Sequence, residues 1–147
     1  EANQRGRFVR RVGAGQDESF LLLATESEVY GDTLVVEKTH DNLGHWQTIN
    51  DRAIWPIYVA HGGRYEVWAT WACDRENAGN SMVIECGSSS IVHEVATTGS
   101  WDTYQRTKFG TLDLPDGAQR LIIRPRARIR GAMIDLKSSL IMMAAPH

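Results

Sequence analysis

Apolar and polar residues alternate along most of the hydrophobic segments of this chain, and this period of two is the feature that most restricts its fold. Between residues 65 and 71 the odd positions are apolar and fall on one face of an extended strand. Trp68 falls on the opposite face, between Glu66 and Thr70. No segment shows a sustained 3.6-residue period, which an amphipathic helix would require. The chain is therefore expected to be all-β.

The same pattern predicts about eight to ten short strands, a number typical of a sandwich. The predicted strands lie at 20–24, 33–37, 55–59, 65–73, 81–86, 91–95, 104–114, 120–125 and 132–142. Pro115, Asp116 and Gly117 form an unambiguous turn between two of them. Strands at this spacing predict a jelly-roll β-sandwich of two antiparallel sheets.

One domain is expected, at residues 16–143, because a chain of 147 residues can bury roughly 70% of its unfolded surface in a single core. Residues 1–15 are polar, basic and glycine-rich, and are expected to be a linker or an edge segment. Residues 144–147 are expected to be a tail. The chain begins at Glu1 without a signal-like apolar segment, so we expect a mature secreted product or a module of a longer protein.

The charge balance argues against two classes of partner. A net charge of −2 and a pI near 6.2 give the whole surface no attraction for nucleic acid or anionic lipid. Apolar runs such as that at 20–24 are a strand's length and far below the roughly eighteen residues of a membrane span. We expect neither a nucleic-acid partner nor a membrane partner.

The two cysteines are expected to be free and buried. If residues 65–73 and 81–86 form a hairpin, Cys73 lies near its tip and Cys86 pairs far along the other strand. The offset along the strands is then roughly 17 Å, which is beyond the reach of a disulfide.

Five tryptophans accompany only three phenylalanines, and their positions differ. Trp55 and Trp71 fall on inward-facing strand positions and are expected in the core. Trp46 and Trp101 stand in polar, glycine-flanked loops. A loop indole either packs its loop onto the sandwich or offers a flat apolar surface to a ligand. These two residues favour binding over catalysis.

Catalytic and cofactor motifs are missing from the sequence. It contains no G-x-S-x-G elbow, no histidine spacing typical of zinc and no complete phosphate-binding loop. We expect neither an enzyme nor an organic cofactor. A glycosidase using two carboxylates from among Glu26, Glu28, Asp102 and Asp135 is the enzymatic alternative. Glu26, Glu28 and Asp135 also suit a structural calcium ion, with solvated or hydrogen-bonded carboxylates as the alternative.

Four arginines alternate through residues 124–130. If this segment were extended, their guanidinium groups would line one face and could hold carboxylates or sulfates with paired hydrogen bonds. Gly131 and the density of charge favour a loop instead, in which the arginines pair with nearby acidic residues.

Several short motifs occur in a familiar order along the chain. They are LGHW at 43–46, WPIYV at 55–59, GRYEV at 63–67, TGSW at 98–101, LPDG at 114–117 and MIDL at 133–136. Over roughly residues 21–142 this order resembles the non-catalytic carbohydrate-binding modules of family 6 and of the related family 35. It is especially similar to modules appended to bacterial sulfatases and fucosidases. The resemblance implies a jelly-roll sandwich of the galactose-binding type.

The resemblance also implies a sugar pocket among the loops at one end, where two aromatic side chains from separate loops clasp one ring. Trp101 matches one of these aromatics, and Trp46, or else His45, matches the other. Arg128 or Arg130 stands where the family commonly has an asparagine, which implies an acidic or sulfated glycan.

Two further sites are implied by the same resemblance. The family's structural calcium would be held by Glu28 and Asp135, with Glu26 as a third ligand. A second sugar site on the concave face of a sheet would involve Trp68.

The expected partner is an oligosaccharide or polysaccharide, and the expected context is a larger multi-domain enzyme outside the cytoplasm, extracellular or periplasmic. A protein-interaction or assembly module of the same fold is the alternative, because exposed tryptophans and arginines are enriched at protein interfaces.

Overall fold

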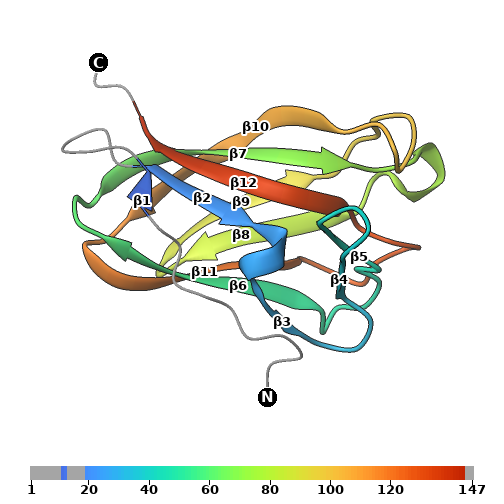
Figure 1. The fold of residues 1–147 in the computed structure, drawn as a ribbon, viewed down its shortest axis with the longest axis horizontal. Helices are drawn as coiled ribbons and strands as arrows, with labels where there is room; N and C mark the ends of the chain where they lie inside the picture. The colour runs from blue at the N-terminus through green and yellow to red at the C-terminus, as the bar shows by residue number, and fades with distance from the viewer. Residues whose placement is uncertain (1–10, 13–18, 145–147) are drawn as a thin grey trace.

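Two antiparallel β-sheets face each other in the computed structural model, which describes residues 11–12 and 19–144 (Figure 1). One sheet contains β1 (Arg11–Val12), β2 (Ser19–Leu23), β4 (Val35–Glu37), β5 (Asn42–Gly44), β7 (Gly63–Ala72), β10 (Gln105–Leu114) and β12 (Asp135–Met143). The other contains β3 (Glu28–Tyr30), β6 (Arg52–Val59), β8 (Ser81–Cys86), β9 (Ser89–Glu94) and β11 (Gly117–Pro125). Two short 3-10 helices, η1 (Ala24–Glu26) and η2 (Arg75–Asn77), connect strands. The predicted all-β sandwich is confirmed.

Strand β12 organises the larger sheet. It pairs with β7 along one edge, and with β2 and then β5 along the other. Strand β10 lies beyond β7, β1 beyond β2, and β4 beyond β5. The smaller sheet has the order β3-β6-β11-β8-β9. Each sheet therefore contains strands from both halves of the chain.

The alternation predicted for residues 65–71 is confirmed in β7. Tyr65, Val67, Ala69 and Trp71 are buried against the opposite sheet. Trp68 points to the outer face and is only partly buried, with its indole N–H donated to Glu66 Oε1 at 3.0 Å. Burial of each large apolar side chain stabilises the fold by roughly 1.5–3 kcal/mol.

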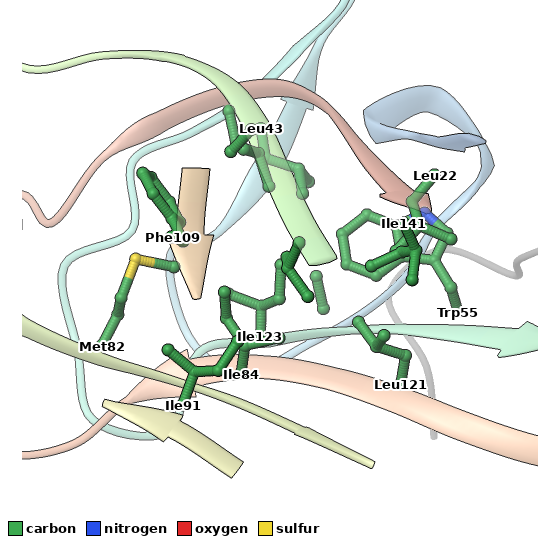
Figure 2. Close-up of a cluster of buried hydrophobic side chains, with 14 of the residues drawn as sticks. Leu22, Leu43, Trp55, Met82, Ile84, Ile91, Phe109, Leu121, Ile123 and Ile141 are labelled. Atoms are coloured by element: carbon green, nitrogen blue, oxygen red, sulfur yellow. The ribbon is translucent and has the colours of Figure 1, made fainter. Parts of the chain in front are cut away.

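The core fills the space between the sheets (Figure 2). Leu22 and Ile141 come from the larger sheet, and Trp55 and Leu121 from the smaller one. None of the four has more than 1% of its surface exposed. The indole N–H of Trp55 donates to Leu23 O at 2.9 Å, so this side chain links the two sheets through a hydrogen bond as well as through packing.

The expected hairpin between residues 65–73 and 81–86 is wrong, because β7 and β8 belong to different sheets. The connection between them crosses from one layer to the other. Cys73 and Cys86 are nevertheless both free and buried, as predicted. Burial raises the pKa of the Cys86 thiol, and burial together with Asp74 and Asp135 raises that of Cys73 to about 11.

Of the predicted edge segment 1–15, the structure describes only Arg11–Val12, which pair with β2 at Phe20 and Ser19. The rest of that segment and residues 145–147 of the predicted tail lie outside the described residues. Among the described residues, no helix has the length and apolar character needed to cross a membrane.

Four connections meet at one end of the sandwich, at the right-hand side of Figure 1. They are residues 38–51, which include the short strand β5, and residues 73–80, 95–104 and 126–134. Because each joins strands at the same end of the sandwich, segments far apart in the sequence come together there.

Candidate functional site

A pocket of about 640 Å³ opens among these four connections. Its walls are formed by Glu37, His40, His45, Gln47, Asn77, Trp101, Asp102, Tyr104, Gly131, Ala132 and Asp135. Glu37 is the last residue of β4, Asp135 is the first residue of β12 and Asn77 is the last residue of η2, while the other lining residues belong to loops. The pocket therefore has a rim of connecting segments set on two strand ends.

The loop that carries Trp101 is fastened to the end of β7. Thr98 N donates to Cys73 O at 2.9 Å, and Cys73 N donates to the hydroxyl of Thr98 at 3.0 Å. Ser100 and Thr103 share a hydroxyl hydrogen bond of 2.9 Å across the loop tip. Trp101 is half-buried: it packs against the edge of the core and lines the pocket. Its indole is thus held in place before any ligand arrives.

The opposite rim is held by two asparagines of the 73–80 connection. Asn77 Oδ1 accepts the backbone N–H of Ala132 at 2.7 Å. The side chain of Asn80 donates to Arg130 O and accepts from Arg130 N, both at 2.9 Å. Gly131 has a φ of +72°, and an added Cβ would overlap the Asn77 amide, so glycine is required there. These contacts present the backbone of 131–132 to the pocket.

His45 and Glu37 form the third wall. His45 Nε2 lies 3.5 Å from Glu37 Oε2, and 57% of the His45 side chain is exposed. Asn42 holds Glu37 from behind, with its amide donating to Glu37 Oε1 at 3.0 Å. Gly44 leaves the space that the Glu37 carboxylate occupies, because a Cβ at position 44 would overlap it.

The prediction that Trp46 stacks on a ligand is wrong. Its side chain has no exposed surface, and its indole N–H donates to Asp51 O at 2.9 Å. The reason lies in the short strand β5, whose Leu43 pairs with Leu136 and brings the chain close to the core. His45 then adopts a positive φ of 59°, and the side chain of Trp46 is buried. His45, the alternative to Trp46, lines the pocket instead.

Asp51 fixes the connection that buries Trp46. Its carboxylate accepts backbone N–H groups of Asp32, Thr33, Gln47 and Thr48, at 2.6 to 3.1 Å. Burial by itself raises the pKa of Asp51, but the hydrogen bonds, led by the Thr33 hydroxyl, outweigh it and hold the pKa below 3.8. The carboxylate therefore stays ionised, and its charge strengthens these hydrogen bonds.

Carboxylates dominate the electrostatics of the pocket. Burial, with further contributions from Glu37, Asp102 and Asp74, raises the pKa of Asp135 to about 7. Burial, followed by Asp135, Glu37 and Asp102, raises the pKa of Tyr104 to about 12. In both residues burial is the larger cause and the neighbouring carboxylates add to it. Among the described residues, neither a lysine nor an arginine lines the pocket.

Arg128 and Arg130 lie outside the pocket, contrary to their predicted role as ligand contacts. Both are exposed, and the Arg130 guanidinium donates to Ala78 O at 3.0 Å. Arg124, from the same run, pairs with Glu85 at 2.9 Å on the outer face of the smaller sheet. The alternative, a loop whose arginines pair with nearby acidic residues, holds only in part. Arg130 lies in a loop but bonds to a backbone carbonyl, and Arg124 pairs with an acidic residue from within β11.

The predicted calcium ligands lie on three different elements. Glu28 lies in β3 of the smaller sheet, where it is 3.3 Å from the Arg120 guanidinium and accepts from the Tyr30 hydroxyl. Asp135 lies in the larger sheet and faces the pocket, and Glu26 is in η1. Within residues 11–12 and 19–144, no three acidic, histidine or cysteine side chains form a group that could hold a metal ion. The calcium site, which would also need backbone carbonyls as ligands, stays a prediction.

The sequence and the fold can be compared with those of known proteins. No family model matches the sequence, and no curated protein matches it either. Among solved structures, a family 35 carbohydrate-binding module from Clostridium thermocellum matches with a TM-score of 0.70, covering 86% of this chain and 98% of its own at 13% identity. The chain has the fold of these modules.

Two further matches support the same carbohydrate-binding-module fold. The family 35 module from Cellvibrio japonicus Abf62 matches with a TM-score of 0.69 and 16% identity, covering 86% of this chain and 94% of its own. The C-terminal family 6 module of the laminarinase LamC from Zobellia galactanivorans matches with a TM-score of 0.68 and 14% identity, covering 84% and 98%. The predicted resemblance to family 6 and family 35 modules is confirmed at the level of the fold.

Proposed function

We propose that this chain is a non-catalytic carbohydrate-binding module that holds one ring of an oligosaccharide or polysaccharide in the loop-end pocket. The observation that supports this most is the position of Trp101. Its indole is partly exposed, and its loop is fixed by one hydrogen bond to the end of β7 and another across the loop tip. The apolar face of a sugar ring stacks on such a plane. His45 stands on another loop, in the place that the resemblance gives to the second aromatic residue.

The polar lining supplies the hydrogen bonds that a sugar ring needs. Glu37 and Asp102 accept from hydroxyl groups, while the amides of Gln47 and Asn77 can donate and accept. Stacking on one indole contributes roughly 1–3 kcal/mol by analogy with base stacking. We expect dissociation constants in the micromolar to millimolar range. A small ligand makes few contacts, and these offset little more than the entropy lost when the ligand is immobilised.

A module of this size acts by bringing a larger attached protein to a polysaccharide. The LamC module, whose fold this chain shares, is itself a part of a laminarinase. We propose that this chain is likewise one part of a larger enzyme and acts where polysaccharides are met, outside the cytoplasm. The acidic or sulfated glycan implied by the arginines has no support in the pocket lining.

A glycan array probed with the purified chain tests the proposal. We expect retention of at least one glycan, and loss of that binding in Trp101→Ala with unchanged circular dichroism. Trp68→Ala is the matched control, because this indole is also partly buried but lies on the outer sheet face. Full retention by Trp101→Ala would reject the pocket, and loss in Trp68→Ala alone would move the site to the sheet face. A chelator arm tests the calcium that the resemblance implies, and we expect no effect.

Two alternatives are decided by companion measurements. Asp102 and Asp135 both line the pocket, so the glycosidase alternative is tested by hydrolysis of chromogenic glycosides, and we expect none. Light scattering tests the assembly alternative. A monomer that binds glycans supports our proposal, whereas an oligomer that buries Trp101 and binds no glycan would replace it.

A further inference from the structure

The side chains around the pocket carry an unbalanced charge. Three carboxylates, those of Glu37, Asp102 and Asp135, line it, and Asp74 is close enough to raise the pKa of Asp135. These groups come from four different segments of the chain: the end of β4, the 73–80 connection, the Trp101 loop and the start of β12. The negative charge is therefore contributed by several segments of the chain and not by a single loop.

The basic groups near the pocket have partners of their own. His45 is 3.5 Å from Glu37, and His40 stands on the exposed rim. The ammonium of Lys137 sits over the ring of Tyr104, 4.3 Å from its centroid, and is not among the lining residues. The Arg130 guanidinium bonds to Ala78 O. Among the described residues, a ligand in the cavity thus meets carboxylates directly and meets no lysine or arginine in the wall.

The hydroxyl groups of a neutral sugar do not require this arrangement. One or two acceptors orient a ring, and amides such as Gln47 and Asn77 would serve without mutual repulsion. Placing like charges around one cavity costs free energy that an entering cation relieves. A uronate or sulfate would add a further negative charge to the same cavity, so the lining disfavours it.

The lining is also spread too widely for a bare metal ion. Within the described residues, no three of these acidic or histidine groups converge as metal ligands do. The volume of about 640 Å³ suits a sugar ring with its substituents. The charge and the size together favour an organic cation built on a ring.

We propose that the pocket selects an amino sugar with a free, protonated amine, as in the glucosamine units of a deacetylated chitin-type polymer. This inference rests on the proposed sugar-binding function and names its ligand class. The ring stacks on Trp101, and the ammonium group donates its hydrogens to the carboxylate of Asp102 and to that of Asp135, which releases its proton to solvent as the cation enters. N-acetylation removes the charge and adds bulk, so the acetylated sugar binds more weakly.

Isothermal titration at pH 6 with three oligosaccharides of equal length tests this inference. They are a glucosamine oligomer, its N-acetylated counterpart and a galacturonate oligomer. We expect the glucosamine oligomer to bind at least about ten-fold more tightly than the N-acetylated one, and to weaken as salt is raised. Galacturonate should show the weakest binding of the three.

Charge-removing variants identify the groups responsible. Asp102→Asn keeps the size of the side chain and should reduce the preference for the amine by about five-fold or more. Asp113→Asn is the matched control, because Asp113 is an exposed carboxylate on β10 that pairs with Arg64 away from the pocket. It should leave the preference unchanged.

Other outcomes separate this inference from the proposed function. Equal affinity for the amine and its acetylated form, preference for galacturonate with or without calcium, or binding only of another neutral glycan would overturn the inference and leave sugar binding intact. Failure to bind any glycan, on the array or in titration, would overturn both.

Discussion

The side-chain amide of Asn77 holds the backbone N–H of Ala132 through a 2.7 Å hydrogen bond, joining two loops that are 55 positions apart in the sequence. Asn77→Ala should lower the free energy of unfolding by about 1–2 kcal/mol and weaken glycan binding, because it leaves a partly buried N–H unpaired and frees one rim of the pocket. Urea unfolding and titration measure the two effects. Gln119→Ala, at the far end of β11, should change neither, and glycan affinity unaltered in Asn77→Ala would show that this rim does not shape the site.

Trp46 is expected to matter for stability and not for ligand contact. Trp46→Phe keeps most of the buried apolar surface but loses the hydrogen bond to Asp51 O, and should cost about 1–3 kcal/mol. Trp55→Phe is the matched control, since Trp55 is equally buried and also donates to a backbone carbonyl at 2.9 Å. Both variants should retain glycan affinity. A Trp46→Phe protein of full stability that no longer binds glycan would contradict this role.

Asp51 makes stability depend on pH at the acid end. Its pKa in the folded chain lies below 3.8, so the folded state binds fewer protons than the unfolded state when pH falls below that value. The stabilisation is present above about pH 3.8 and is lost as pH falls through the folded pKa. Asp51→Asn, which cannot be ionised, should be less stable at neutral pH by about 2–4 kcal/mol and show a flatter acid limb. Unfolding midpoints of the wild type and of Asp51→Asn, measured between pH 2 and 5, test this. A variant whose stability falls with acid as steeply as that of the wild type would contradict it.

Asp135 acts in the opposite direction and in a different window. Its pKa rises from 3.8 in the unfolded chain to about 7 in the folded one, so the folded state holds the proton more tightly between those values. Stability should fall as pH rises from about 4 to about 7. Asp135→Asn should remove this slope and be more stable at pH 8, by about 1–2 kcal/mol after allowance for partial exposure. Asp113→Asn should keep the wild-type slope, and an unchanged slope in Asp135→Asn would assign it to another group.

The strand pattern predicted the parts of the fold that depend on alternation. The faces of Tyr65, Trp68 and Trp71 could be read directly, because period two places every second side chain in the core. The pairing of strands could not. β7 and β8 follow each other in sequence but lie in different sheets, and nothing local distinguishes a connection that crosses the sandwich from a hairpin.

The sequence predicted the candidate site only for residues whose position is set by a single loop. Trp101 stands in a loop fixed largely by its own threonine and serine residues, and the polar context signalled that loop. The environment of Trp46 is set by β5, three residues whose pairing with β12 depends on a segment about ninety positions away. Glu37, Asn77 and Tyr104 were missed because only the assembled loops bring them together.

Chemical-shift mapping by NMR during titration with a glycan that the chain retains is the most direct test of the loop-end pocket. We expect the largest chemical-shift changes at the Trp101 indole N–H and at the backbone amides of Gly131 and Ala132. The resonances of Trp68 should not change. Shifts confined to Trp68 and its neighbours on the outer face of β7, with the pocket silent, would contradict the account.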